Sequence, residues 1–272
     1  MKTNPPLGSI EPCAQLLERP SNDTLLYKIT TIENLLRSID SNYLYFNRVD
    51  MYMDFEGADL YDGKQPPKDF QISDKIKFEK APDYSAADYY SKSRSRTYAC
   101  CFSLENSKFI WDNYANGSSK GKVCIVLNFG KLREYLNKTF YTTKAFYNKE
   151  DFGQPFSLHY GNIEYINWVE HQECKKQLPN SIKYTYLKDK KFSDEKELRI
   201  SLSSIGIGEF VSGNDIIDFP DSLQFPFDFR KANMNNIITK LLISPDCDVQ
   251  YLKAELNNRN DTVVFRNSSK SI

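Results

Sequence analysis

The chain has 272 residues, 40% of them hydrophobic, and its 36 basic and 36 acidic side chains cancel. This balance leaves no global field that favours nucleic acid or a membrane surface, and the lack of a long apolar run argues against a membrane-spanning helix. The six cysteines form no C-x-x-C pair and only two histidines accompany them, so we expect no metal site and a reduced, cytoplasmic protein. The first twenty residues contain no apolar h-region, so we expect no secretory signal.

The first quarter of the chain predicts an arm followed by a strand, a helix and a second strand. Residues 1–22 contain four prolines and are expected to form a loose N-terminal arm. Residues 25–29 and 42–49 have the composition of strands. Between them, apolar side chains at helical spacing predict a helix, and Thr30 with Glu33 fits a capping box at its start.

The remainder of the chain reads as strands with a few scattered helices. We expect strands at 97–104, 122–129, 159–168, 195–204, 238–245 and 262–265. We expect helices within 81–96, at 130–136, and after a cap formed by Asp246 or Asp248. The fold class is therefore α+β, with a single domain at residues 23–266, a mixed and mostly antiparallel sheet, peripheral helices, and a polar tail at residues 267–272.

The strand at 195–204 has two distinct faces. Leucine and isoleucine side chains alternate with Glu197, Arg199 and Ser201, so the polar residues share one face. Glu197 and Arg199 lie about 7 Å apart along that face. They fit a set of cross-strand ion pairs, and an exposed sheet face with Glu and Arg also suits a nucleotide site.

A polar segment between two strands carries two large aromatic side chains, Trp111 and Tyr114. Three residues apart, they are predicted to share one face of a short helix. They either fill a core or line a pocket.

Two charged stretches admit two interpretations each. Asp54 and Glu56 share one face of an extended loop, where they could bind a divalent ion or simply face water. The basic run at residues 91–96 could contact phosphates or form a solvated loop.

Several short motifs, taken in order, resemble the bacterial domain-of-unknown-function family 2971. They are LLYKITTIENLLRSIDSNYLYF, MDFEG, CFSLENSKFIWDNYANGSSKGKVCIVL and FSDEKELRI, and together they span roughly residues 25–255. MDFEG keeps Asp54 and Glu56 but lacks the Asn and Pro of the family's Asn-Asp-Pro-x-Glu loop. In the last motif Leu198 stands where the family has Trp.

A more distant resemblance is to the ADP-ribosyltransferase superfamily. Its members use a strand carrying His or Arg, a strand–loop–helix carrying Ser and Tyr, and a strand carrying Glu. CCFSLENSKFIWDNYAN is similar to the middle element, and YKITTIENL to the opening of DNA-modifying toxins in that superfamily. The resemblance implies a split sheet, cleavage of NAD, and transfer of ADP-ribose to nucleic acid or protein.

Residue roles follow from the resemblance, position by position. Tyr114 would hold the nicotinamide leaving group, and Glu197 would be the catalytic acid that stabilises the ribosyl cation. Ser103 would lie near the ribose, and Trp111 and Arg199 would belong to the same nucleotide site.

The first strand departs from the superfamily's pattern. Lys28 stands where the superfamily has His, and a lysine offers donors only, which puts simple NAD binding in doubt. Tyr27 is the alternative residue for orienting the nucleotide.

Two classes of function stay open. The first is an ADP-ribosyltransferase-like enzyme, acting as a toxin or an anti-phage defence effector. The second is a non-catalytic nucleotide-sensing or interaction domain on the same scaffold. The missing first-strand His favours the second, and the polar face with Glu197 and Arg199 favours the first.

Overall fold

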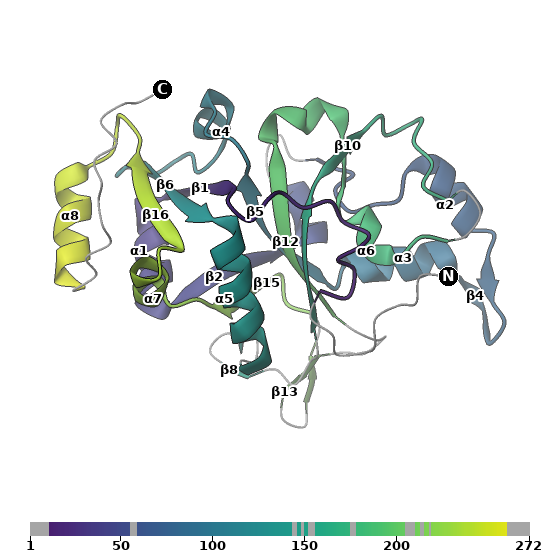
Figure 1. Ribbon diagram of the computed structural model, residues 1–272. Coiled ribbons are helices and arrows are strands. Elements are labelled where there is room, and N and C mark those ends of the chain that lie inside the picture. Colours follow the sequence, from purple (N-terminus) through teal and green to yellow (C-terminus); the bar gives the residue numbers. More distant parts are fainter. Residues whose placement is uncertain are drawn as a thin grey trace.

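The computed structural model describes most of the chain (Figure 1). The described residues are 11–54, 59–142, 146–147, 150–151, 156–174, 178–204, 210–212, 215–217 and 219–259. The strand expected at 262–265 and the tail expected at 267–272 lie outside them.

The central sheet forks at its middle strand, β5 (Thr97–Ser103). One edge of β5 pairs along its whole length with β12 (Glu197–Ser204). The opposite edge is shared: β1 (Leu25–Thr31) pairs at the Ser103 end, and β2 (Tyr43–Arg48) pairs at the Thr97 end. The two strands therefore diverge from one edge of β5.

The other strands extend the sheet on both sides of the fork. Beyond β1 lie β6 (Lys122–Asn128) and β16 (Ile238–Ile243), and beyond β12 lies β9 (Phe156–Asn162). Beyond β2 lie β15 (Ser222–Pro226), β7 (Phe146–Tyr147) and β8 (Glu150–Asp151). Every pairing in this sheet is antiparallel, which confirms the predicted α+β fold with a mostly antiparallel sheet.

Four helices cover the first face of the sheet and form the main core with it. They are α1 (Ile32–Ser41), α5 (Phe129–Thr142), α7 (Phe229–Met234) and α8 (Val249–Asn258). In α1 the side chains at helical spacing are the buried ones: Ile32, Leu35, Leu36 and Ile39. They pack with the apolar face of β12, as the alternation in that strand predicts.

The cap of α1 differs from the prediction by one residue. Thr31, not Thr30, is the N-cap, and its side chain accepts a hydrogen bond from the Asn34 amide. The capping box of Thr30 and Glu33 is therefore wrong. Of the two caps predicted for α8, Asp246 and Asp248, the structure has Asp248 as the N-cap, and its side chain accepts a hydrogen bond from the Tyr251 amide.

A second layer covers the other face of the sheet at the β5–β12 end. It contains helices α2 (Pro67–Ser73), α3 (Ala86–Arg94) and α6 (Ser181–Tyr184), and the parallel strand pair β10 (Glu164–Ile166) and β11 (Leu187–Asp189). Two 3-10 helices, η1 (Val49–Asp54) and η2 (Lys190–Glu195), complete it.

This layer corrects one expectation. Glu197, Arg199 and Ser201 lie on one face, but that face is not exposed: they are 5%, 0% and 0% accessible. The sequence of β12 alone does not reveal what packs on it.

Three smaller elements lie outside these layers. They are α4 (Lys108–Asn113), the hairpin of β3 (Lys77–Phe78) with β4 (Ala81–Ser85), and the hairpin of β13 (Phe210–Ser212) with β14 (Asp215–Ile217). No helix among the described residues has the length and apolarity needed to cross a membrane.

The described part of the predicted N-terminal arm is not loose. Cys13 and Leu17 are buried in a small cluster with Tyr186. The Glu11 carboxylate accepts hydrogen bonds from Arg133 of α5 at 2.6 and 3.0 Å, and from Asn137 at 2.8 Å. Buried apolar contacts and a paired carboxylate thus fix this segment on the domain.

Candidate functional site

Three predicted site residues form a row across the fork of the sheet. Tyr27 of β1 is paired with Ser103 of β5, and Ser103 is paired with Glu197 of β12. Directly opposed residues of antiparallel strands lie on the same face, about 5 Å apart at Cβ. The expectation that β5 and β12 belong to one sheet is therefore confirmed.

Arg199 links Glu197 to a loop far away in the sequence. Its Nε donates to Glu197 Oε1 at 2.8 Å. Its two terminal nitrogens donate to the two carboxylate oxygens of Asp62, at 2.7 and 2.9 Å, and one of them also donates to the Thr185 carbonyl at 2.8 Å. The guanidinium is thus held by a bidentate carboxylate inside the protein.

The Asp62 loop has little freedom to move. Gly63 follows it with φ of +71°, and a Cβ there would lie 2.7 Å from Val49 Cγ1. Arg94 Nε donates to the Asp62 carbonyl at 2.6 Å. The basic run at 91–96 is therefore only partly solvated, because Arg94 and Arg96 are buried whereas Lys92 is exposed.

Lys188 of β11 is the second cation of the site. Its ammonium lies 2.5 Å from Glu195 Oε2, 3.4 Å from Glu197 Oε2 and 3.9 Å from Asp62 Oδ2. Three carboxylates thus surround two cations, and all five side chains are buried. We call Asp62, Lys188, Glu195, Glu197 and Arg199 the charged cluster.

The two glutamates of the charged cluster have opposite pKa shifts. Burial disfavours the charge of Glu197, but Arg199 and Lys188 outweigh burial and lower its pKa to about 2. For Glu195 burial prevails over Lys188, and the neighbouring Glu197 adds to it, so its pKa is raised. Neighbouring carboxyls with diverging pKa values are the usual arrangement of an acid–base pair.

Tyr114 lies between the charged cluster and solvent. It is 40% exposed, and it lies close enough to Glu195, Lys188 and Glu197 for their charges to act on its pKa. Burial around the hydroxyl, followed by the charge of Glu195, raises the pKa of Tyr114. Tyr114 and the two glutamates therefore lie on the same side of the sheet, as predicted.

Trp111 does not share a helix face with Tyr114. Helix α4 ends at Asn113, and Tyr114 is its C-cap with extended backbone angles, so the expected helical pairing is wrong. The Trp111 indole donates to Asn106 Oδ1 at 2.8 Å and packs, half-buried, on Cys124 and Val126 with Tyr27 nearby. It forms an apolar wall over β1 and β6.

Ser103 and Lys28 are engaged elsewhere. The Ser103 hydroxyl donates to the Glu195 carbonyl at 2.8 Å and so fixes the end of η2. Lys28 lies one residue from Tyr27 and so faces the opposite side of the sheet. Its ammonium donates to the Cys101 carbonyl at 3.2 Å and lies 5.1 Å from the centre of the Phe102 ring. Of the two first-strand alternatives, Tyr27 is the one on the face of Glu197.

Three members of the charged cluster were missed by sequence reasoning. Glu195 could have been identified from the sequence, because it precedes Glu197 by two residues in the same polar stretch. Lys196 between them adopts a left-handed conformation with φ of 46°, and both carboxylates reach Lys188. Asp62 and Lys188 lie on separate segments, and no sequence spacing connects them to β12.

The acidic loop predicted at Asp54 and Glu56 is only partly described. The backbone of Asp54 ends η1, while its side chain and the whole of Glu56 lie outside the described residues. Among the side chains that are described, no group of three or more His, Cys, Asp or Glu is arranged to hold a metal ion.

Comparison with known proteins finds a similarity to one family over part of the chain. Residues 110–200 match the family described as "Protein of unknown function (DUF2971)". The matched segment includes Tyr114, Lys188, Glu195, Glu197 and Arg199, whereas Tyr27, Asp62 and Ser103 precede it. No curated protein and no solved structure matches the chain.

Proposed function

We propose that the protein is an ADP-ribosyltransferase-like enzyme that cleaves NAD and transfers ADP-ribose to a nucleic acid or protein. One observation carries the proposal: Glu195 and Glu197 share Lys188 as counter-ion but differ in the direction of their pKa shifts. Their location beside Tyr27, Ser103 and the exposed Tyr114 supports it.

The two carboxyls fit two steps of one transfer. The bond between the nicotinamide nitrogen and ribose C1′ breaks, and its electron pair leaves with nicotinamide. Glu197, ionised at neutral pH, stabilises the positive charge that develops on the ribose. A nucleophile of the acceptor then bonds to C1′, and its proton passes to the Glu195 carboxylate that pairs with Lys188, whose raised pKa makes it the stronger base of the two.

The aromatic side chains fit the leaving group. Tyr114 offers a partly exposed ring beside Glu195, and Tyr27 and Trp111 are half-buried on the same side of the sheet. Flat rings of this kind can stack on nicotinamide. Lys28 has no role in this proposal, because its ammonium lies on the other face.

A second function is favoured by one feature of the charged cluster. The Glu197 side chain is 6% exposed and that of Arg199 1%, and each is paired within the protein. A carboxylate so enclosed suits a scaffold that binds a nucleotide without cleaving it. The alternative is therefore a non-catalytic nucleotide-sensing or interaction domain.

Release of nicotinamide from NAD by the purified full chain tests the proposal. It should be measured with NAD alone, with added nucleic acid and with added cell extract. Glu197→Gln should lower turnover about 10²–10³-fold with little loss of stability, if its role is electrostatic. Glu195→Gln should lower transfer to the acceptor more than release into water.

The matched control is Glu134→Gln, which changes an exposed glutamate on α5. It should leave turnover unchanged. If wild-type protein releases nicotinamide in none of the three mixtures, the enzyme is ruled out. A rise in melting temperature on adding NAD would then support the sensing domain, because a ligand that binds only the folded state stabilises it.

A further inference from the structure

Acceptors hold the Arg199 guanidinium at two different edges. At one edge Nε donates to Glu197 Oε1 at 2.8 Å. At the other edge the terminal nitrogens donate to both carboxylate oxygens of Asp62, at 2.7 and 2.9 Å, and to the Thr185 carbonyl at 2.8 Å. A planar group bound in this way cannot turn without breaking several charge-assisted hydrogen bonds at once. The position of Asp62 therefore determines where the Arg199 Nε–H points.

Asp62 is placed to act on the site only through other residues. It is 2% exposed, and its carboxylate lies at the edge of the guanidinium that is turned away from Glu197. Its other charged neighbour is Lys188, whose ammonium lies 3.9 Å from Asp62 Oδ2. A substrate that reaches Glu197 therefore does not contact Asp62, and any influence of Asp62 on the reaction passes through the two cations.

The turn that carries Asp62 is fixed at several points. The Asp62 amide donates to the Asp59 carbonyl at 3.1 Å, and the Lys64 amide to the Tyr61 carbonyl at 2.8 Å. The buried Asp59 carboxylate accepts from the Tyr61 amide at 2.9 Å and from the Asp189 amide of β11 at 3.3 Å. Because β11 also carries the second cation of the charged cluster, this one turn fixes the surroundings of both cations.

The two oxygens of Glu197 are held unequally. Oε1 accepts from Arg199 at 2.8 Å, whereas the contact of Oε2 with Lys188 is longer, at 3.4 Å. A hydrogen bond of that length is weak, so Oε2 is the oxygen that a substrate can engage more readily. A rotation of the carboxylate that exchanges the two oxygens would break the bond from Arg199.

We propose that Asp62 is a positioning residue, which orients the Glu197 carboxylate through Arg199 so that Oε2 faces the substrate. The role of Asp62 in turnover rests on the transfer reaction proposed above, whereas its hold on Arg199 does not. A carboxylate fixed in advance where positive charge develops stabilises that charge without having to reorient. A misplacement of about 1 Å, caused by a residue remote from the reacting atoms, can cost about 10²-fold in rate.

The first experiment follows the Arg199 Nε–H group and needs no activity. In nitrogen–proton correlation spectra of the full chain, its signal is identified by its absence from Arg199→Lys. An enclosed N–H that is bonded to a carboxylate exchanges slowly with water. Asp62→Asn keeps the shape of the side chain but replaces one acceptor oxygen by a donor. Exchange of the Nε proton should then become about tenfold faster or more, as the loss of one charge-assisted hydrogen bond predicts.

The second experiment measures nicotinamide release by wild type, Asp62→Asn, Glu197→Gln and the double variant. Asp62→Asn should lower kcat about 10–10²-fold and leave KM nearly unchanged, because Asp62 does not contact the substrate. In the Glu197→Gln background the same change should cost less than about twofold, because the group through which Asp62 acts is already altered. A mere loss of stability would lower kcat by the same factor in both backgrounds.

The matched control is Asp69→Asn, which changes another fully buried aspartate of the second layer. The Asp69 carboxylate accepts from the amides of Glu173 and Cys174, at 3.0 and 3.1 Å, and from the Tyr184 hydroxyl at 2.9 Å. None of these partners belongs to the charged cluster. Asp69→Asn should therefore lower the melting temperature but leave the exchange of the Arg199 Nε proton and kcat as in wild type.

Melting curves check that each variant is folded. Should Asp62→Asn not fold, Asp59→Asn loosens the same turn without removing an acceptor of Arg199. In that variant, exchange of the Nε proton should again be faster than in Asp69→Asn.

Three results would overturn the proposal. They are Nε exchange in Asp62→Asn as slow as in wild type, an equal acceleration by Asp69→Asn, and an equal loss of kcat in both Glu197 backgrounds. No release of nicotinamide by wild type would overturn the reaction and the role of Asp62 in turnover. The exchange measurement would then still decide whether Asp62 holds Arg199 in place.

Discussion

Glu195 and Glu197 are two residues apart and share the Lys188 ammonium, yet burial raises the pKa of one while cations lower the pKa of the other. Glu197 has Arg199 as a second ion-pair partner at 2.8 Å, whereas among the described residues Glu195 pairs with Lys188 alone. The presence of Arg199 beside Glu197, and its absence beside Glu195, therefore decides the direction of each pKa shift.

The two glutamates should affect acid stability in opposite directions. The pKa of Glu197 is about 2 in the folded protein against 4.5 as its ordinary value, so its contribution, about 3 kcal/mol, is present above pH 4.5 and lost as the pH falls towards 2. Glu197→Gln should therefore be less stable than wild type above pH 4.5, and the difference in unfolding free energy should shrink as the pH falls towards 2. The measurement is urea unfolding at a series of pH values.

Glu195 should change the stability of the protein in the opposite direction. Its pKa is raised in the folded protein, so the folded wild type gains stability as the pH falls through that pKa to 4.5. Gln resembles the protonated carboxyl at every pH, so the stability of wild type should rise relative to that of Glu195→Gln on acidification in this higher window. Identical pH dependence of the two variants would contradict the split of the pair.

Loss of Arg199 should be severe. Arg199→Met leaves Asp62 and Glu197 buried with Lys188 alone, and breaking a buried ion pair costs about 3–5 kcal/mol. The control is Lys138→Met, which removes an exposed pair with Glu134 and should cost less than about 1 kcal/mol. Unfolding free energies that are equal for the two variants would refute a structural role of the guanidinium.

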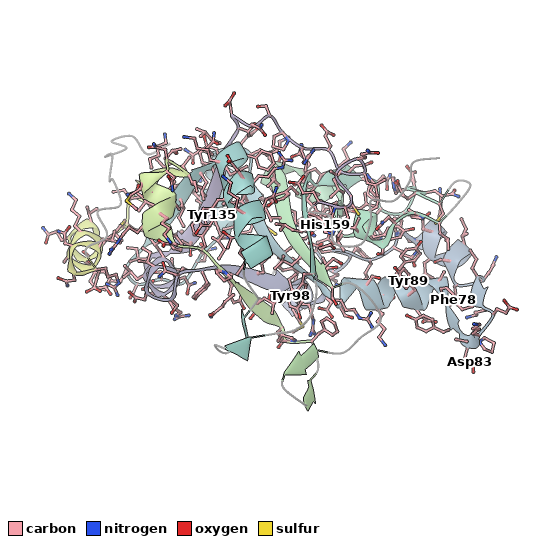
Figure 2. All side chains as sticks on the ribbon, turned by 60° about the horizontal axis from the view of Figure 1, so that its bottom comes forward. Phe78, Asp83, Tyr89, Tyr98, Tyr135 and His159 are labelled. Atoms are coloured by element: carbon pink, nitrogen blue, oxygen red, sulfur yellow. The ribbon has the colours of Figure 1, made fainter. Side chains whose placement is uncertain are left out.

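His159 should make the protein sensitive to acid. It is buried in β9, and burial lowers its pKa to about 3 from 6.5 (Figure 2). Between these values the unfolded chain binds a proton that the folded chain does not, so stability falls with decreasing pH by up to about 1.4 kcal/mol per unit. His159→Gln should remove this slope.

A second variant separates the titration of His159 from its hydrogen bond. The imidazole Nε2 lies 2.7 Å from the Ser157 hydroxyl. Ser157→Ala breaks that contact and keeps the imidazole, so the slope should persist. Equal pH dependence of stability in wild type and His159→Gln from pH 6.5 to 3 would show that His159 does not titrate in this way.

Trp111 and Tyr114 should differ in their contributions to stability. Trp111→Ala removes a half-buried ring from the apolar wall over β1 and β6 and should cost about 2–4 kcal/mol. Tyr114→Ala removes a ring that is 40% exposed and should cost about 1 kcal/mol or less. Chemical unfolding measures both, and equal large losses would mean that Tyr114 is core as well.

Most strands were predicted correctly from the sequence, because the alternation that marks a strand is a local property. The strands expected at 97–104 and 122–129 correspond to β5 and β6 within one residue. The expected strand at 159–168 is two strands, β9 and β10, because the chain leaves the main sheet near Ile163. The expected helix at 130–136 is longer, and α5 extends from Phe129 to Thr142.

The burial of side chains and their interaction partners could not be predicted from the sequence, because both depend on distant segments of the chain. Nothing in β12 itself indicates that Arg199 is enclosed, since the layer that covers it comes from other parts of the chain. Its partner Asp62 lies 137 positions earlier. The small elements around the β3–β4 hairpin were also missed, since their strands have only two and five residues.

The fork at β5 has a consequence for synthesis of the chain. Ser103 emerges from the ribosome 94 residues before Glu197, its partner on β12. At about 5–20 residues per second, β5 remains without its β12 partner for roughly 5–20 s. During that time the backbone groups along this edge of β5 can pair with other chains. We therefore expect nascent chains that stop before β12 to be cleaved readily by protease and to aggregate, and chains that include β12 and the segments after it to resist both.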